Sequence, residues 1–585
     1  MDAKSKTIDC LFAKICKHLK SHDKELNQNF IKLTTNFDRF KFIWHIGFIG
    51  KELDLLFNNT NFSPKDATKA SAFRQEGNEQ FKTKRFFDAL VKYNSSLQFS
   101  SASQPENNLA LAYANRSAVF YHLNEFQLCL NDIESALRAG YPQKSRPKLI
   151  ERKLNCLLRL EQYSSGIEFI KAEKINLSSD VCQNFEKKFK TASADKKLTP
   201  LEQQFYFENY GHIDLTITSP NPKVACASKS IDIDYSMERG FFLRAAKDIQ
   251  VGELLVNEPP FASVLMAHKI GHNCFECILK LNPLKMNVTY CRQCCLVAYC
   301  SEKCAAASWT HTHKYECKYL NFLINQSGLS HMEWLALRVV LKAGKSYLLS
   351  LKPLLEEYEQ QFESSLRDGS CMAFAEGEDK VYSSHSYLPI FNLVTNSQVR
   401  KLNDLFRRSF VAFFLVKLLE KSDFFEADSA EGFKENQWFI GGLILRHLQS
   451  ISCNAHEVAE LHLSNAKKNA MAESSAQGIG AGIFAILSLF NHSCDPHVTR
   501  NFRGSRCQVR AVQNVKKGEE IYDNYGVLYA VNELKERRHK LKDQYFFECK
   551  CVPCRNDWPL YDKIESQLEM KNNLKTECID NLAVS

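Results

Sequence analysis

A cluster of cysteine and histidine residues between positions 274 and 317 constrains the fold of this chain more than any other feature. It contains four closely spaced pairs, Cys274-x2-Cys277, Cys291-x2-Cys294, Cys300-x3-Cys304 and His313-x3-Cys317. Zinc takes four sulfur or nitrogen ligands in a tetrahedron, and a Cys-x2-Cys turn supplies two of them. The spacing therefore predicts two zinc ions. Cys295 competes with Cys294 on spacing alone, and His311 competes with His313, although only His313 keeps the three-residue gap to Cys317.

The N-terminus and the 22 cysteines of the chain together predict the cellular compartment of the protein. Met1 to Lys6 lead into no apolar signal segment, and the longest apolar runs, near 42–49 and 482–490, are too short to span a membrane. Cysteines in such a chain predict metal sites and buried thiols rather than disulfides. We expect an intracellular protein, cytoplasmic and nuclear, without a membrane segment. The net charge of +9 is spread along the chain and gives no direct evidence of nucleic-acid binding.

Residues from about 70 to 175 carry an internal helical repeat. Leu90, Tyr93 and Leu97 recur 40 positions later as Leu130, Ile133 and Leu137, and the first two recur again as Ile167 and Ile170. The phrases around Gly77 and Ser117 resemble the first helices of tetratricopeptide (TPR) repeats, in which a small residue lets paired helices approach closely. Three repeats are about the minimum for a stable stack. The alternative is an unrelated helical bundle.

Four phrases elsewhere carry the chemistry. They are Glu238-Arg239-Gly240, Asn491-His492-Ser493-Cys494-Asp495-Pro496, the run from Gly518 to Tyr525, and Tyr545 to Cys554 with its Cys-x-Cys-x2-Cys ending. This series resembles a SET methyltransferase domain, and the cysteine cluster resembles a MYND zinc finger. Together with the repeats, the chain resembles the TPR-bearing branch of the SET and MYND domain (SMYD) protein-lysine methyltransferases, over roughly residues 70 to 555.

The resemblance implies an α+β multidomain fold in which a TPR array precedes a β-rich SET domain, which is interrupted by the finger and a helical insert. The expected divisions are a helical extension over 1–65, TPR-like repeats over 66–175, the first part of the SET domain over 195–270, the MYND finger over 271–320, a helical insert over 321–440, the SET core over 441–548, and a post-SET zinc segment with its tail over 549–585.

The implied activity is transfer of a methyl group from S-adenosylmethionine to a lysine side chain of a histone or non-histone protein. This in-line displacement needs orientation of two reactants rather than a nucleophilic side chain. Tyr525 and Tyr545 match the family's catalytic tyrosine and lysine-channel aromatic. The positions that match cofactor contacts are Arg239, Asn454, Asn491, His492 and Phe547. A tyrosine such as Tyr525 considered alone is more often a partly buried structural residue, and only its place seven residues after Gly518 favours the catalytic interpretation.

The resemblance also implies the zinc ligand sets, with three ions in structural roles. Cys274, Cys277, Cys300 and Cys304 hold one ion; Cys291, Cys294, His313 and Cys317 hold the second; and Cys494, Cys549, Cys551 and Cys554 hold the third. A finger of this size has too little apolar core to fold without metal.

One departure from the family pattern concerns the cofactor. Active relatives usually have glycine where this chain has Glu238, and a carboxylate there predicts weak cofactor affinity or loss of activity. The alternative function is therefore a catalytically weak or inactive adaptor that binds proteins through its finger and its repeats.

Two partner classes complete the expectations. Arg74, Asn78, Asn115, Lys148 and Arg152 occupy the positions that hold the two C-terminal carboxylates of Hsp90 or Hsp70 tails in some TPR arrays. The i, i+4 spacing of Arg74 with Asn78, and of Lys148 with Arg152, places each pair on one helix face. Each alone is also an ordinary solvated helix residue. For the finger we expect histone deacetylase or other transcriptional partners.

Overall fold

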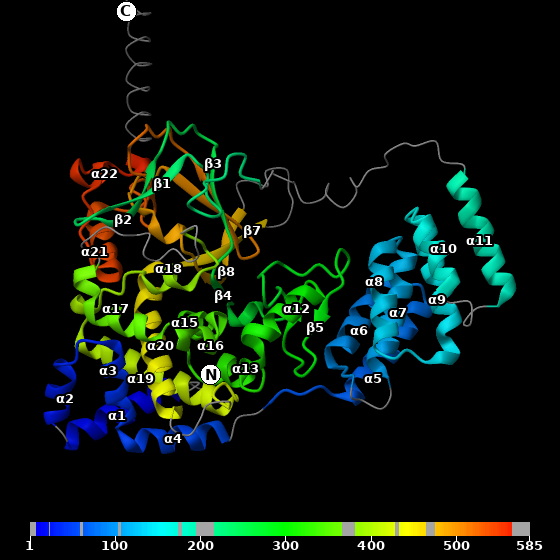
Figure 1. The fold of residues 1–585 in the computed structure, drawn as a ribbon, viewed down its shortest axis with the longest axis horizontal. Coiled ribbons are helices and arrows are strands. Elements are labelled where there is room, and N and C mark those ends of the chain that lie inside the picture. Colours follow the sequence, from blue (N-terminus) through cyan, green and yellow to red (C-terminus); the bar gives the residue numbers. More distant parts are fainter. Residues whose placement is uncertain are drawn as a thin grey trace, which may run out of the picture. The chain divides into compact units, whose positions relative to one another are not determined.

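The computed structural model describes residues 7–22, 24–58, 62–102, 107–172, 178–194, 216–365, 381–426, 432–463 and 474–563 (Figure 1). It has two compact units. Unit 1 comprises Met1–Asn58, Thr216–Met266 and Gly328–Ser585, and unit 2 comprises Asn59–Leu215 and Ala267–Ser327. Helical and strand-containing parts alternate along the chain, which confirms the predicted α+β multidomain fold. Among the described helices, none combines the length and apolarity needed to cross a membrane.

Unit 2 begins with seven described α-helices, with the short 3-10 helix η1 (Gln143–Ser145) between the fourth and the fifth. They are α5 (Ala67–Lys82), α6 (Phe86–Phe99), α7 (Asn108–His122), α8 (Phe126–Arg138), α9 (Arg146–Arg159), α10 (Tyr163–Ala172) and α11 (Ser179–Ala194). The side chain of Asp66 starts α5 by accepting a hydrogen bond from the Lys69 amide. A Cβ atom placed on Gly77 would lie 2.6 Å from the ring of Tyr93 on α6, so glycine permits the close approach of these two helices.

The second part of unit 2 is the cysteine-rich segment. It contains a short 3-10 helix η3 (Ala267–Lys269), strands β5 (Thr289–Tyr290) and β6 (Ala298–Tyr299), α12 (Glu302–Ser308), the π-helix η4 (Trp309–His313), α13 (Lys314–Glu316) and α14 (Leu320–Asn325). A buried ion pair joins this segment to the helices. Arg116 on α7 bonds Asp132 on α8 and also donates to the carbonyl of Val288, while Asn287 donates to Asp132.

The N-terminal helices of unit 1 pack on two long helices, one in the predicted insert and one that runs from the insert into the predicted SET core. The N-terminal helices are α1 (Thr7–His22), α2 (Lys24–Ile31), α3 (Asn36–Trp44) and α4 (Gly47–Asn58), and their partners are α19 (Leu402–Lys421) and α20 (Phe433–Asn454). Phe37 stacks on Phe439 with 5.5 Å between ring centroids. A Cβ on Gly442 would overlap the ring of Phe37, so the bare backbone of α20 makes room for α3.

Unit 1 also holds the sheets. Strand β1 (Ile231–Ser236) pairs antiparallel with β2 (Gly240–Ala245). The order β10 (Val498–Arg503), β11 (Arg506–Ala511), β3 (Leu254–Glu258) forms one three-stranded sheet, and β4 (Ala262–Leu265), β8 (Ser474–Ile483), β7 (Ala455–Leu463) forms another. The short strands β9 (Asn491–His492) and β12 (Tyr522–Asp523) pair in parallel.

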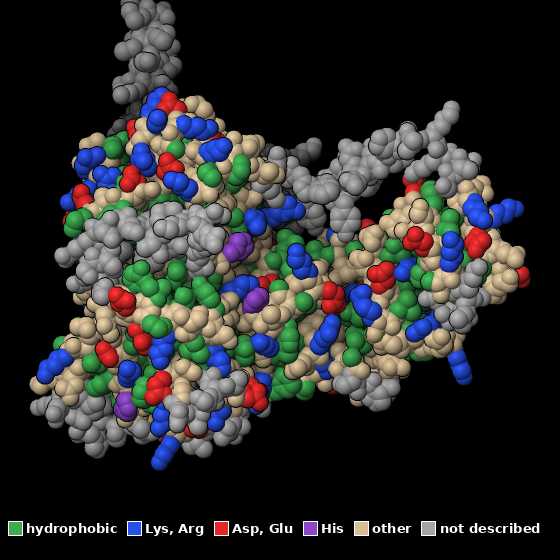
Figure 2. All heavy atoms as spheres, in the orientation of Figure 1, with side chains coloured by type: hydrophobic (Ala, Val, Ile, Leu, Met, Phe, Trp, Pro, Cys, Tyr) green, Lys and Arg blue, Asp and Glu red, His purple; other side chains and the backbone are tan. Residues whose placement is uncertain are grey.

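The remaining helices of unit 1 complete its core. They are α15 (His331–Ala343), α16 (Lys345–Ser350), α17 (Lys352–Ser365), α18 (Tyr387–Phe391), α21 (Leu534–Tyr545) and α22 (Val552–Arg555), with short 3-10 helices at Ser397–Val399 and Leu487–Leu489. A capping box between Ser330 and Glu333 starts α15. On the face shown in Figure 2, Lys and Arg side chains are interspersed with Asp and Glu side chains.

Candidate functional site

A cavity of about 1020 Å³ in unit 1 brings together every residue predicted for catalysis and cofactor binding. Its lining includes the predicted set Arg239, Asn454, Asn491, His492, Tyr525, Tyr545 and Phe547. These residues come from the β1–β2 turn, the end of α20, the β9–β12 pair and the end of α21. The volume is at the upper end of the range for ligand pockets, about 300–1,000 Å³.

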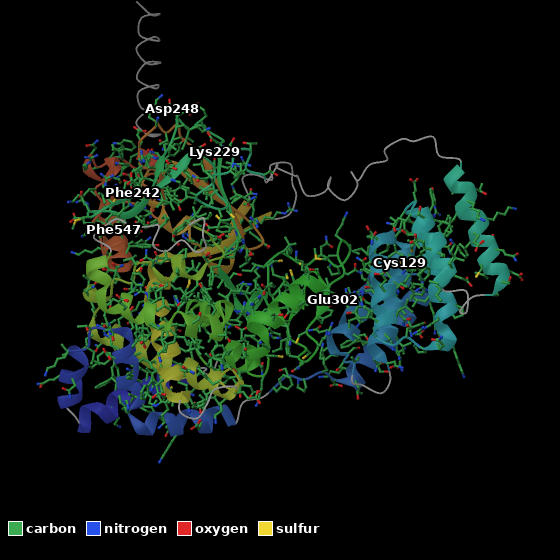
Figure 3. The ribbon with its side chains drawn as sticks, in the orientation of Figure 1. Cys129, Lys229, Phe242, Asp248, Glu302 and Phe547 are labelled. Carbon is green, nitrogen blue, oxygen red and sulfur yellow. The ribbon has the colours of Figure 1, made fainter. Side chains whose placement is uncertain are left out.

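The β1–β2 hairpin positions Arg239. Ser236 and Gly240 are cross-strand partners, so Met237, Glu238 and Arg239 form the turn between them. The Arg239 amide donates to the Ser236 hydroxyl over 3.2 Å, and Gly240 has a φ of +70°, which favours glycine. The guanidinium lies 5.5 Å from the ring centroid of Phe242 on β2, which Figure 3 labels. The one position of this turn with a positive φ is therefore occupied by Gly240, and Glu238 is not at that position.

Glu238, which departs from the family pattern, lies at this turn and is exposed. Glu238 lines the cavity, as does the neighbouring Arg239. The backbone of the hairpin keeps its antiparallel register through this turn, with Tyr235 opposite Phe241. The side chain thus adds a negative charge at the rim without interrupting the hairpin.

The parallel pairing of β9 with β12 brings Asn491 and His492 beside the run that ends at Tyr525. The Tyr525 amide donates to Nδ1 of His492 over 3.1 Å. Burial lowers the pKa of His492 to about 4, because a charged imidazolium would lose its hydration there. A neutral imidazole can accept this backbone hydrogen bond.

Four rings enclose one side of the cavity. The centroids of Tyr525 and Tyr545 lie 4.7 Å apart, and Phe547 stands edge-on to Tyr525 at 6.4 Å. The ring of His492 lies 5.2 Å from that of Tyr525. Phe547 is labelled in Figure 3, just beyond α21. Aromatic rings at these separations form a narrow apolar wall suited to an alkyl chain.

The hydroxyl of Tyr525 donates to the carbonyl oxygen of Phe490 over 2.8 Å. Burial raises the pKa of the Tyr525 hydroxyl above its ordinary value, because the phenolate would be poorly solvated. The phenol therefore keeps its proton at neutral pH and presents oxygen lone pairs, which accept hydrogen bonds.

Asn454 is the last residue of α20, where the helix joins β7. Its amide nitrogen donates to the carbonyls of Ser450 and Val394, at 2.7 and 2.9 Å. These bonds fix the side chain at the cavity wall and tie the end of α20 to the loop at 392–396. The helix end is therefore part of the site.

One residue of the cavity lining, Glu520, and one that supports the lining, Arg400, were missed by the sequence reasoning. Glu520 accepts hydrogen bonds from Arg239 and Asn491, and it lies in the Gly518–Tyr525 run without having been assigned a role. Arg400 donates to Ser452 and to Cys453 at the end of α20, and its guanidinium lies 5.1 Å from the ring of Phe546. No local spacing could have revealed Arg400, because its contacts reach 52 and 53 positions along the chain.

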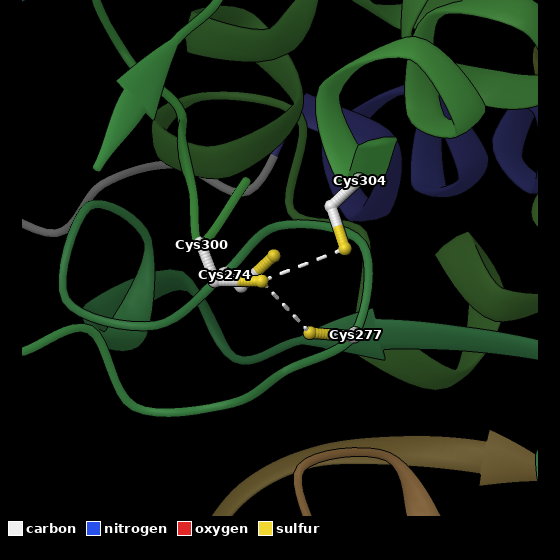
Figure 4. Close-up of side chains that lie close together, drawn as sticks. All are labelled: Cys274, Cys277, Cys300 and Cys304. Atoms are coloured by element: carbon white, nitrogen blue, oxygen red, sulfur yellow. Dashed lines mark hydrogen bonds between the residues drawn. The ribbon is translucent and has the colours of Figure 1, made fainter. Parts of the chain in front are cut away.

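The cysteines converge into three groups that could hold metal ions. The groups are Cys274, Cys277, Cys300 and Cys304 (Figure 4); Cys291, Cys294, His313 and Cys317; and Cys494, Cys549, Cys551 and Cys554. In each group the ligand atoms lie within 4.8 Å of one another. These are the sets implied by the family resemblance, and Cys294 and His313 are the members chosen over Cys295 and His311.

The geometry of these groups fits zinc. Sulfur atoms lie 3.6 Å apart in the pair Cys277 and Cys300, 3.8 Å in Cys291 and Cys317, and 3.5 Å in Cys494 and Cys554. A disulfide requires about 2.05 Å. A tetrahedron with zinc–sulfur bonds of 2.3 Å has edges of about 3.8 Å, close to these separations. All four positions of each tetrahedron are supplied by side chains, which is typical of structural zinc.

The residues predicted to clamp a peptide lie on α5, α7 and α9 of unit 2. They are Arg74, Asn78, Asn115, Lys148 and Arg152. Asn115 donates to Asn78 over 2.8 Å, which joins α5 and α7. Arg152 donates to Ser117 over 2.7 Å, and Lys148 is exposed. The helices therefore bring the two asparagines together, while Arg152 also donates to the Ala114 carbonyl and so makes two hydrogen bonds within the protein.

Comparison with known proteins adds to this geometry. Residues 240–526 match the SET domain family. The chain is 28% identical over 549 residues to "Protein-lysine N-methyltransferase SMYD4" of Mus musculus, covering 84% of this chain and 67% of that protein. It is 25% identical over 557 residues to the protein of the same name from Homo sapiens. It is also 29% identical over 318 residues to human "Histone-lysine N-methyltransferase SMYD3", covering 54% of this chain and 59% of that protein.

Proposed function

Since the chain belongs to the SET and MYND domain (SMYD) family of protein-lysine methyltransferases, we propose that it methylates lysine side chains of histone or non-histone proteins in the cavity of unit 1. The methyl donor in this proposal is S-adenosylmethionine. The observation that carries the proposal is the common cavity lined by Arg239, Asn491 and Tyr525, which lie far apart in the sequence.

S-adenosylmethionine supplies an electrophilic methyl group on a positively charged sulfur. The residues of the chain bind and orient. Phe547 offers a ring face for a purine, and the amide oxygens of Asn454 and Asn491 can accept hydrogen bonds from the polar groups of a nucleoside and an amino acid. Arg239 offers a charge-assisted hydrogen bond to a carboxylate. Holding two reactants in line can supply much of the rate enhancement of a displacement reaction.

The role of Tyr525 follows from its contacts. Its proton is donated to the Phe490 carbonyl, which leaves the lone pairs of the phenol oxygen as acceptors, and Tyr525 lines the cavity. An incoming neutral amine can donate one N–H to that oxygen, which aims the nitrogen lone pair. Burial between Tyr525 and Tyr545 also disfavours a charged lysine and lowers its pKa. Tyr525 therefore orients the amine and does not act as a general base.

The test uses the full-length protein and a Tyr525→Phe variant, each incubated with labelled S-adenosylmethionine and cell extract. The wild type should transfer label to lysines that mass spectrometry can locate. The variant loses one orienting hydrogen bond and should be slower by roughly 10-fold or more. Absence of lysine labelling with wild type, despite measurable cofactor binding, would contradict the proposed activity and support an adaptor.

We propose that three zinc ions occupy the three cysteine groups. Each donor set is complete and the sulfur atoms already stand at tetrahedral separations. The third group links Cys494, three residues after Asn491, to the segment that follows Phe547. Zinc there would stabilise the cavity, because the segments that carry Asn491 and Phe547 would be tied to one ion.

We further propose that the helices of unit 2 are TPR repeats that bind the C-terminal tails of Hsp90 or Hsp70. The pairing of Asn78 with Asn115 and the exposed Lys148 support this proposal. Lys148→Glu should abolish binding of a tail peptide in a titration, because it replaces a cation facing a carboxylate with an anion. Lys187→Glu on α11 makes the same charge change outside the set and should leave affinity unchanged. Equal affinities for both variants would refute the clamp.

For the MYND finger we propose protein partners, histone deacetylase among them. The finger's metal ligands are all protein side chains, which favours a binding or structural role over catalysis. Chaperone partners at the repeats and histone deacetylase at the finger would place the protein in both the cytoplasm and the nucleus. Imaging of a tagged protein, together with co-precipitation of histone deacetylase by wild type but not by a Cys291→Ser variant, would test this; equal recovery with both proteins would count against it.

A further inference from the structure

The carboxylate of Glu520 lies in the wall of the cavity and connects its polar residues. The residue is 7% exposed. Its Oε2 accepts hydrogen bonds from Nη1 of Arg239 at 2.7 Å and from the hydroxyl of Tyr522 at 2.8 Å. Its Oε1 accepts a hydrogen bond from Nδ2 of Asn491 at 2.8 Å. Three donors from separate segments thus meet on one buried carboxylate.

Glu520 determines which way the Asn491 amide faces. A carboxylate accepts hydrogen bonds and cannot donate, so the amide nitrogen of Asn491 must be the atom directed to it. The amide oxygen is then left as an acceptor at the cavity, which Asn491 lines. An acceptor beside a negative charge suits an ammonium group, which is a cation with donors only.

Glu520 also holds Arg239 from one side. A guanidinium has five N–H donors, and Glu520 receives one of them at Nη1. The Arg239 side chain is half exposed, at 50%. Its remaining donors can make a paired contact with a second carboxylate brought by a ligand. The two oxygens of Glu520 therefore hold one residue suited to an ammonium group, Asn491 on Oε1, and one suited to a carboxylate, Arg239 on Oε2.

We propose that Glu520 is a positioning residue that selects the α-amino acid end of the cofactor, directing its ammonium to Asn491 and its carboxylate to Arg239. This inference rests on the proposed function, because the methionine part of S-adenosylmethionine is such a zwitterion. It assigns a specific task to a residue that touches Arg239, Asn491 and Tyr522 rather than the methyl group.

The test measures binding by calorimetry with three ligands. S-adenosylhomocysteine carries both charges of the amino acid and no charge on sulfur, its analogue without the α-amino group lacks the ammonium, and 5′-methylthioadenosine lacks the amino acid entirely. The proteins are the full-length wild type, Glu520→Gln, and Glu519→Gln as a control. Glu519 is exposed and bonds the backbone of Lys516, so its change removes the same charge one position away.

Wild type and Glu519→Gln should bind S-adenosylhomocysteine at least about 10-fold more tightly than the deaminated analogue, as expected for a charge-assisted hydrogen bond. Glu520→Gln should lose most of that preference and keep wild-type affinity for 5′-methylthioadenosine. The inference fails if wild type shows no preference for the amino group, if Glu520→Gln retains it, or if that variant loses affinity for all three ligands equally. Binding of none of the ligands by wild type would overturn the proposed function itself.

Discussion

The buried ion pair of unit 2 gives a prediction with a calculable size. Arg116 is 1% exposed and makes two parallel bonds to Asp132, at 2.7 and 2.8 Å. Its third nitrogen donates to Asn94 and to the carbonyl of Val288 in the finger. Replacing Arg116 with Met keeps an apolar chain of similar length and removes all of these bonds. Asp132 would then keep a hydrogen bond from Asn287 but lose its charged partner.

The size follows from the cost of an unpaired buried charge. Removing one partner of a buried pair destabilises by about 3–5 kcal/mol. Unit 2 spans about 220 residues, for which each kcal/mol lowers the melting temperature by about 2–4 °C. We therefore expect Arg116→Met to lower the melting transition of this unit by roughly 6–20 °C.

Differential scanning calorimetry on the zinc-loaded full-length protein measures this shift. The double variant Arg116→Met, Asp132→Leu removes both charges and should recover much of the lost stability, because no unpaired carboxylate remains. As a control, Lys153 and Glu134 form a partly exposed ion pair in the same unit. The variant Lys153→Met should lower the free energy of unfolding by less than about 1 kcal/mol. The reasoning is wrong if Arg116→Met melts within 2 °C of wild type, or if the double variant is no more stable than the single one.

Two further changes test the metal ligands and the N-terminal helices. Cys294→Ser should reduce the zinc content measured by atomic emission from three ions to two, whereas Cys295→Ser should leave it at three, and the opposite result would mean that the ligand set is wrong. Removing zinc with a chelator should also lower the stability of unit 2, as seen by circular dichroism, because the ligands lose their common partner. Gly442→Ala should destabilise by roughly 1–3 kcal/mol in urea denaturation, because its Cβ overlaps Phe37. The same change at Gly50, where nothing lies within 4 Å, should be neutral or stabilise by up to about 1 kcal/mol; a loss at both sites would contradict the packing argument.

Local patterns in the sequence predicted the parts of this protein whose partners are near in the chain. The eight ligands between 274 and 317 come in pairs with two or three residues between them, and Asn491-His492 lies next to Cys494 in one short motif, so both were visible without a structure. Helical periodicity likewise indicated α5 to α10. The sequence could not decide between Cys294 and Cys295, because adjacent residues differ by only one position in their spacing to every other ligand.

Tertiary structure alone decided the contacts between distant segments. Asn36 bonds Glu359 across 323 positions, and this contact helps to hold the N-terminal helices in unit 1. Arg239 meets Glu520 across 281 positions, and that contact orients the polar wall of the cavity. Such pairings depend on how helices and strands pack in space, and hydrophobic periodicity specifies which face of an element is buried but not which element covers it.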